Sequence, residues 1–251
     1  MNVEALKDLL YKIADDQLIL GHRNSEWTGL GPLLEEDIAF SSMAQDKVGQ
    51  SYAFYQLLEQ LGEQKPDTIA FHRSAENFKN CQLVELPNQE YDFSLIRHFL
   101  FDKAELLRFE LLSQSSYEPL ALLSKKLLGE VRYHVMHADA FIKQLGSATE
   151  ESILRLQTSL NEALPYALGI FEPSDLEMDI INDGIFAGEE ALKERWIETV
   201  FTTISKTELN LADIDSITPI YGGRRGIHTE HLQPLLNEMT EVLNLDPSAE
   251  W

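Results

Sequence analysis

The sequence predicts an all-α fold, an antiparallel helical bundle, in a single domain covering residues 1–251. Three observations predict it. Apolar residues recur at three- and four-residue steps along most of the chain, which is the spacing of one helical face. Several of these stretches exceed about twenty residues and are joined by short connections, as in bundles. No segment shows the alternation that would indicate a β-strand.

The first half of the chain predicts two helices and then a loop. Leu6, Leu9, Leu10 and Ile13 share one face of a first helix, and a longer periodic stretch covers residues 35–61. The sequence GEQKP then ends this second helix, because glycine favours a helix stop and proline cannot continue one. The irregular residues that follow, through Pro87 and Asn88, predict a long surface loop.

The middle of the chain predicts three further helices. Helical spacing resumes over residues 92–113, and Ser115, Ser116 and Pro119 indicate the start of a helix over residues 118–145 that stops at Gly146. Another helix begins near Thr149 and reaches about Gly169. We expect Pro165 to kink its last turn, because proline removes a backbone donor.

The last third predicts two helices separated by an irregular stretch. The first covers residues 189–205, and the second covers residues 229–243. Between them lies the glycine-rich sequence GGRRG, residues 222–226, which cannot continue a helix. With these elements the predicted bundle is complete, and the sequence contains no internal repeat.

Composition excludes several classes of protein. No stretch approaches the roughly 18 consecutive apolar residues of a membrane helix. The N-terminal sequence MNVEALKDLLYKIADD lacks the basic and then apolar order of a secretory signal, so we expect a cytoplasmic protein. Lysine and arginine total 20 against 42 acids, giving a formal charge of -22 that disfavours nucleic acid and anionic membranes as partners.

The single cysteine, Cys81, excludes an intrachain disulfide and a thiolate metal cluster within one chain. We expect it to be a half-buried small residue. A second kind of metal site, the di-iron centre of helical bundles, uses one Glu from each of two helices and a Glu-x-x-His pair from each of two others. A metal-binding pair of this kind would be visible in the sequence as Glu-x-x-His within a predicted helix.

Two segments are candidates for such a pair, QDKVGQ at residues 45–50 and GEVRYH at residues 129–134. Neither contains Glu-x-x-His. Glu130 precedes His134 by four residues, so the two share a helical face and form either a ligand pair or an intrahelical hydrogen bond. His134 and His137 are three apart but lack an acid at the right step, which favours buried, hydrogen-bonded histidines.

Several longer motifs resemble one family over nearly the whole chain. They are LGHRNSEWTGLGPLLEEDIA, QDKVGQ, TIAFHR, VELPN, EVRYH and GGRRGIHTEHLQPLLNEM. Together they are similar to the structural C-subunit family of the bacterial multicomponent phenylacetyl-CoA epoxidase, which acts in phenylacetate catabolism. The resemblance implies a ferritin-like helical bundle and a subunit without activity of its own.

The resemblance also implies partners and a reaction. A related A subunit holds the di-iron centre, accessory B and D subunits assist, and a flavin and iron–sulfur reductase delivers electrons from NADPH. The complex adds one oxygen atom of O2 across the aromatic ring of phenylacetyl-CoA to give the 1,2-epoxide. The C subunit pairs with A and is expected to hold no cofactor of its own.

Comparison with the metal-binding motifs of the A subunit implies which ligands are missing. A motif like Asp-Glu-Ala-Gly-His falls on DKVGQ, so Lys47 and Gln50 stand at its two ligand positions. A motif like Glu-Glu-Ser-Phe-His falls on EVRYH, which places Val131 and His134 at the other two. Glu26 matches a further ligand acid. We expect that Lys47 replaces the metal by pairing with Glu26 in the interior.

The segment GGRRG is the compact basic element of an acidic chain. Arg224 and Arg225, with His228, Glu230 and His231 close behind, predict contact with an acidic partner or a CoA phosphate. The alternative is a solvated loop before a capped helix. His228 and His231 share a helix start but lack the further donors that a metal site requires.

Three functions therefore compete on the sequence alone. The first is a non-catalytic partner subunit, and the second is an autonomous di-iron oxygenase or oxidase of ferritin-like fold. The third, a free-standing acyl-CoA-binding module, depends on Arg224 and Arg225 alone. If the chain is a partner subunit, aromatic residues such as Trp27, Tyr52, Phe54 and Tyr55 are candidates for interface anchors, and equally for the core.

Overall fold

The computed structural model describes residues 1–246, so residues 247–251 of the predicted domain lie outside it. Over this range the chain forms α-helices and short 3-10 turns without a β-strand, and the all-α prediction is confirmed. Four helices are long: α1 (Val3–Ser25), α2 (Leu34–Gln60), α4 (Tyr91–Leu112) and α5 (Glu118–Leu145). The others are α3 (Pro66–Phe71), α6 (Glu150–Leu168), α7 (Glu177–Asn182), α8 (Glu189–Ile204), α9 (Leu232–Met239) and α10 (Glu241–Leu245).

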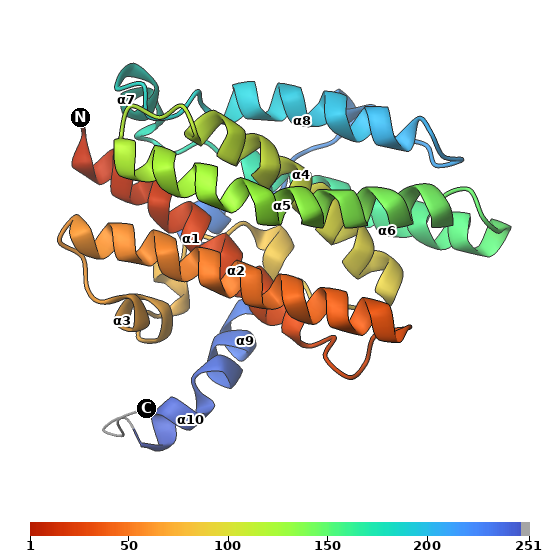
Figure 1. Cartoon of the computed structure of the whole chain (residues 1–251), viewed down its shortest axis with the longest axis horizontal. Helices are drawn as coiled ribbons and strands as arrows, with labels where there is room; N and C mark the ends of the chain where they lie inside the picture. The colour runs from red at the N-terminus through yellow and green to blue at the C-terminus, as the bar shows by residue number, and fades with distance from the viewer. Residues whose placement is uncertain (247–251) are drawn as a thin grey trace.

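The long helices form two packed pairs, α1 with α2 and α4 with α5, as a ferritin-like bundle requires (Figure 1). Gly21 allows the first pair to approach closely. A Cβ added at Gly21 would lie 3.0 Å from Cγ2 of Val48 and 3.3 Å from the carbonyl oxygen of Ala44. A larger residue at this position would therefore push α1 and α2 apart.

Helix α1 is buried along most of its length, although its sequence is rich in charge. The apolar positions predicted from the sequence, Leu6 to Ile13, are in the core. The helix continues to Ser25, and Lys12, Asp15, Asp16 and Gln17 are buried beside them. Buried charges are stable only when they are paired, so the neighbours of α1 must supply partners.

The segment predicted as a surface loop is mostly buried over residues 78–86, whereas residues 62–77 are largely exposed. It contains α3 and two 3-10 turns, η1 (Ala75–Asn77) and η2 (Gln82–Glu85), and Phe78, Leu83 and Val84 belong to the main core. Cys81 is fully buried, not half-buried. Over residues 78–86 the prediction was wrong, because this part lacks helical periodicity yet is apolar enough to pack against α1.

The C-terminal half covers one side of the bundle and then leaves it. Helix α6 begins with a capping box between Thr149 and Ser152, and Trp196 of α8 is buried with its indole N–H donating to the carbonyl of Leu100. Helix α7 was not predicted, and the predicted last helix is divided at Thr240 into α9 and α10. These two project from the bundle in Figure 1. Within residues 1–246, no helix has the length and apolar character needed to cross a membrane.

Candidate functional site

A buried lysine occupies the interior between the four long helices. Nζ of Lys47 on α2 lies 2.6 Å from Oδ1 of Asp102 on α4, and neither side chain has exposed surface. The ammonium also donates to Oε1 of Gln17 on α1 at 3.4 Å and lies 4.9 Å from the ring centroid of Phe101. The fourth helix, α5, contributes His134, whose Nδ1 lies 3.5 Å from Oδ1 of Asp102.

Asp102 is the centre of this cluster. Oδ2 of Asp102 lies 2.5 Å from Nδ1 of His98, one helical turn earlier on α4. Burial alone would raise the pKa of Asp102, but the Lys47 ammonium and the His98 and His134 rings hold it well below its usual range. Asp102 is therefore a carboxylate that accepts hydrogen bonds from the groups around it.

The two histidines of the cluster differ in their titration. Burial lowers the pKa of His98 to about 4 despite the neighbouring Asp102, so its ring is neutral at pH 7 and donates Nδ1–H to that carboxylate. Burial also lowers the pKa of His134, but the carboxylates of Asp102 and Asp46 outweigh it, and the pKa is raised overall. Nε2 of His134 lies 3.0 Å from Oδ2 of Asp46.

The donor set of this interior does not fit two iron ions. A di-iron centre in a helical bundle needs four carboxylates and two histidines, whereas Gln17, Lys47, Gln50 and Val131 all face the interior as buried side chains that are not acids. An ammonium has three donors and no lone pair, so Lys47 cannot be a ligand. In the described part of the chain, no group of three or more His, Cys, Asp or Glu residues is arranged to hold a metal.

Four of the five residues identified from the resemblance are fully buried in the bundle. Lys47 and His134 belong to the Asp102 cluster, and Val131 is an apolar core residue. Gln50 connects α2 to α5 of the other packed pair of helices, because its Nε2 donates to Oε2 of Glu130 at 3.0 Å. Glu130 therefore bonds across to α2 and not to His134 along its own helix.

The predicted pair between Lys47 and Glu26 is wrong. Oε1 of Glu26 lies 2.7 Å from Nη1 of Arg23, Oε2 accepts from Nδ2 of Asn88 at 3.0 Å, and the side chain is 29% exposed. Lys47 instead bonds to Gln17. At 1.5 Å per residue, Gln17 lies roughly 13 Å before Glu26 along α1. Glu26 is the C-cap residue of α1, whereas the Asp102 cluster lies farther back along that helix, beside Gln17.

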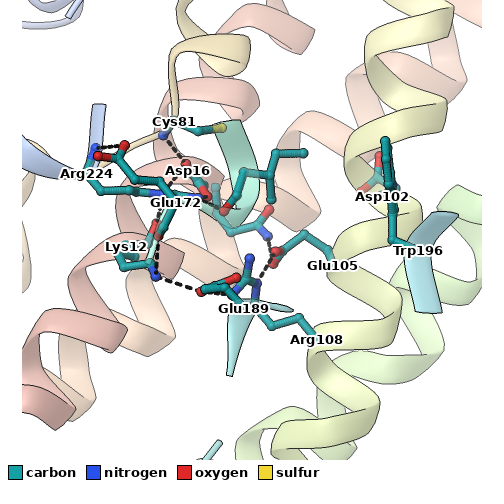
Figure 2. A network of polar contacts seen from close by, with 12 residues as sticks. Lys12, Asp16, Cys81, Asp102, Glu105, Arg108, Glu172, Glu189, Trp196 and Arg224 are labelled. Atoms are coloured by element: carbon teal, nitrogen blue, oxygen red, sulfur yellow. Dashed lines mark hydrogen bonds and ion pairs between the residues drawn. The ribbon is translucent and has the colours of Figure 1, made fainter. Parts of the chain in front are cut away.

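Asp102 and His98 were missed by sequence reasoning. A signal was present, because a histidine and an aspartate four residues apart on an otherwise apolar stretch share the inward face of a helix. Figure 2 shows Asp102 on α4 beside a second set of buried charges. Gln17 joins the two sets, since its Oε1 accepts from Lys47 and its Nε2 donates to Oε2 of Glu105 at 2.8 Å.

The second set is a chain of ion pairs between α4, α8 and α1 (Figure 2). Arg108 pairs with Oε1 of Glu105 at 2.9 Å and with Oε1 of Glu189 at 2.8 Å, and Lys12 pairs with the same Glu189 oxygen at 2.6 Å. Burial raises the pKa of Glu105 although Arg108 opposes it. For Glu189, Arg108 and Lys12 outweigh burial and lower the pKa to about 2. These pairs connect the helices around the core.

Arg224 is part of the core and is not available as a contact for a partner or for CoA. It is 4% exposed, and its two Nη atoms each lie 2.8 Å from an oxygen of Asp16, while Nη2 also donates to the carbonyl of Ile170. The GGRRG segment is thus not a solvated loop at this position. The physical reason is close packing, since a Cβ added at Gly223 would lie 2.3 Å from the carbonyl oxygen of Asn80.

The other residues of this segment divide between interior and surface. Nδ1 of His228 lies 2.5 Å from Oε1 of Glu85 and its Nε2 lies 3.1 Å from the carbonyl oxygen of Phe78, so both ring nitrogens have partners. Arg225 has a side chain that is 52% exposed and pairs with Asp175 and Glu172. Glu230 is exposed and His231 is partly exposed. Contact with a partner or CoA remains a prediction for the exposed residues.

Comparison with known proteins agrees with the motifs found in the sequence. The phenylacetic acid catabolic protein family matches residues 1–251. Over 241 residues the chain is 31% identical to the C subunit of the 1,2-phenylacetyl-CoA epoxidase of Escherichia coli strain K12, covering 96% of this chain and 96% of that relative. The predicted resemblance is confirmed. The chain belongs to the phenylacetic acid catabolic protein family.

Proposed function

We propose that this chain is a non-catalytic structural subunit that pairs with the di-iron A subunit of a phenylacetyl-CoA 1,2-epoxidase complex in aerobic phenylacetate catabolism. One observation carries the proposal. The ammonium of Lys47, bonded to Asp102, stands between the four long helices at the place where a di-iron bundle gathers its ligands. Similarity to the C subunit of the Escherichia coli enzyme supports the remainder.

In this proposal the chain supplies rigidity to the complex. The buried pairs centred on Asp102 and Glu189 connect α1, α2, α4, α5 and α8, so the bundle keeps its shape without a metal. A rigid neighbour can fix the helices of a catalytic subunit and exclude water from one side of it. The accessory B and D subunits and the reductase would act through the assembled complex in the cytoplasm.

The surface formed by α2 and α5 is the proposed contact with the A subunit. Each helix carries exposed apolar side chains whose spacing places them on one helical face: Ile38 and Tyr52 on α2, and Leu122, Tyr133 and Met136 on α5, together called the exposed stripe. Large apolar patches on a protein surface mark sites of association. Among the aromatic residues predicted as anchors, Tyr52 is available here, whereas Phe54 and Tyr55 are buried in the core.

The two helices that carry the exposed stripe are bonded to each other, which holds them at a fixed distance. Nε2 of Gln50 donates to Glu130, His134 lies 3.0 Å from Asp46, and Nε2 of His137 lies 3.0 Å from Oε1 of Glu36, so α2 and α5 are bonded at three levels. Gly49 and Gly129 lie between the apolar side chains, and a Cβ at either would meet no atom within 4 Å. The backbone of both helices is therefore open to close approach by helices of a partner.

Iron content tests the proposal directly. The purified chain would be loaded with ferrous ion under anaerobic conditions, alone and after co-expression with the A subunit. We expect no stoichiometric iron on the chain alone and about two irons per A–C pair, with the two chains purifying together. Two irons held tightly by the chain alone would instead establish the autonomous di-iron oxygenase or oxidase.

A further inference from the structure

A cationic hollow lies between α4, α5 and α8, which are neighbours in the fold (Figure 1). It has a volume of about 450 Å3. Four basic side chains line it, namely Lys103, Lys143, Arg195 and Lys206. In a chain with 20 basic and 42 acidic residues, such a gathering of cations is unexpected and needs a physical reason.

The acids near the hollow do not balance these cations. Asp139 is shared, with Oδ1 lying 2.9 Å from Nζ of Lys103 and Oδ2 lying 3.6 Å from Nζ of Lys143. Arg195 pairs with Glu110 at 3.0 Å, and Glu198 also lines the hollow. Four cations thus face three carboxylates, and within residues 1–246 Lys206 makes no ion pair.

Lys103 shows that the site is built into the fold and is not a set of surface lysines. Its side chain is 7% exposed and lines the hollow from the core helix α4. Burial lowers the pKa of Lys103, Asp139 opposes this, and Lys143 and Lys206 lower the pKa further. A buried ammonium with two more ammoniums close by favours the addition of an anion.

The α8 side of the hollow adds a neutral hydrogen-bond donor. The hydroxyl of Thr203 is engaged with Asp139 at 3.3 Å, and that of Thr199 donates to the carbonyls of Arg195 and Trp196. Thr202 lies beside them, is exposed and lines the same hollow. Its hydroxyl can donate to a bound anion together with the lysines.

We propose that this hollow binds the phosphate group of a small phosphate ester. Lysine ammoniums are compact point charges that suit phosphate, whose charge near -2 exceeds that of a carboxylate. A hollow of 450 Å3 is within the range of small-molecule sites and admits a phosphate with its adjoining group. The negative field of the whole chain is screened within about 8 Å at physiological salt, so the local cations dominate inside the hollow.

Isothermal titration with the full chain tests this inference, using inorganic phosphate and coenzyme A as separate probes in a buffer of physiological ionic strength. We expect saturable binding of at least one probe, weakened tenfold or more in the double variant K143Q/K206Q. The matched control is K126Q, an exposed lysine on the same helix α5 outside the hollow, and it should leave binding unchanged.

The two probes separate the sources of phosphate. Equal affinity would assign a site for a free phosphate group, and tighter binding of coenzyme A would assign a site for a larger phosphate ester. Absence of saturable binding by both probes, or equal weakening by K126Q, would overturn the proposal. Because the titration uses the chain alone, its outcome is independent of the iron content that tests the proposed function.

Discussion

Nζ of Lys47 lies 2.6 Å from Oδ1 of Asp102 in an interior where neither side chain reaches solvent. The ammonium compensates the charge of this buried carboxylate from within the chain. Since His98 and His134 face the same carboxylate, the charge of Asp102 is compensated from α2, α4 and α5. The stability of the bundle should therefore depend on this pair.

The first prediction concerns the removal of one partner. Lys47→Met leaves the Asp102 carboxylate buried without its ammonium, and we expect the free energy of unfolding to fall by about 3 kcal/mol or more. The double variant K47M/D102N should recover part of this loss, because an amide carries no charge to compensate. Urea unfolding followed by circular dichroism measures both, and an unchanged midpoint for K47M would contradict the assignment.

The second prediction concerns pH. The pKa of His98 is about 4 in the folded chain against 6.5 when unfolded, so the unfolded chain binds more protons between these values. The contribution of neutral His98 to the free energy of unfolding is therefore fully present above about pH 6.5 and is lost as the pH falls toward 4. The shift in the pKa of His98 corresponds to about 3 kcal/mol in the free energy of unfolding.

The variant His98→Gln isolates this contribution, because glutamine can still donate to Asp102 but does not titrate. We expect the fall in unfolding free energy between pH 7 and pH 4.5 to be smaller in H98Q than in the parent chain. His134, whose pKa is raised, acts in the opposite direction but is common to both proteins. Parallel pH profiles for the two chains would show that His98 is not the titrating group.

The third prediction distinguishes a structural arginine from an exposed one. Arg224→Met should destabilise the isolated chain by about 3 to 5 kcal/mol, because it leaves Asp16 buried and unpaired. The neighbouring variant Arg225→Gln removes an exposed side chain that pairs with Asp175 and Glu172, and it should lower stability much less than Arg224→Met. Thermal unfolding of both, without any partner, provides the comparison. Equal midpoints would refute the structural role of Arg224.

The fold could be predicted from the sequence because long apolar periodicity suffices to define helices. The ends of α2, α4, α5 and α8 lie within one or two residues of the prediction. Helix α1 was traced only as far as Ile13, because the buried Lys12, Asp15, Asp16 and Gln17 break the apolar pattern. Their partners lie far away in the sequence, and no local pattern reveals a pair such as Arg224 with Asp16.

The site was predicted only in part, because a local sequence pattern does not reveal partners on other helices. The family motifs located Lys47, Gln50, Val131 and His134, all of which are buried in the bundle. Spacing within one helix cannot show which side chain on another helix comes opposite. Glu26 was therefore chosen as the partner of Lys47, whereas the fold brings Asp102 of α4 there. Pairing across helices is a tertiary property and had to be observed.

The fourth prediction concerns the contact with the A subunit. Tyr133 and Met136 are exposed on α5, so the double variant Y133E/M136E should place two charges in the proposed apolar contact. We expect loss of co-purification with the A subunit, while the melting temperature of the isolated chain changes by less than about 2 °C because both positions are solvated.

A control for this prediction is Leu154→Glu, which places a charge at another exposed apolar residue, on α6. Because α6 does not belong to the α2–α5 surface, L154E should retain the A subunit in a pull-down at the same salt concentration. If Y133E/M136E still binds the A subunit as the parent chain does, the contact lies elsewhere on the bundle. If L154E alone abolishes binding, α6 forms the contact, and the exposed stripe of α2 and α5 requires a different partner.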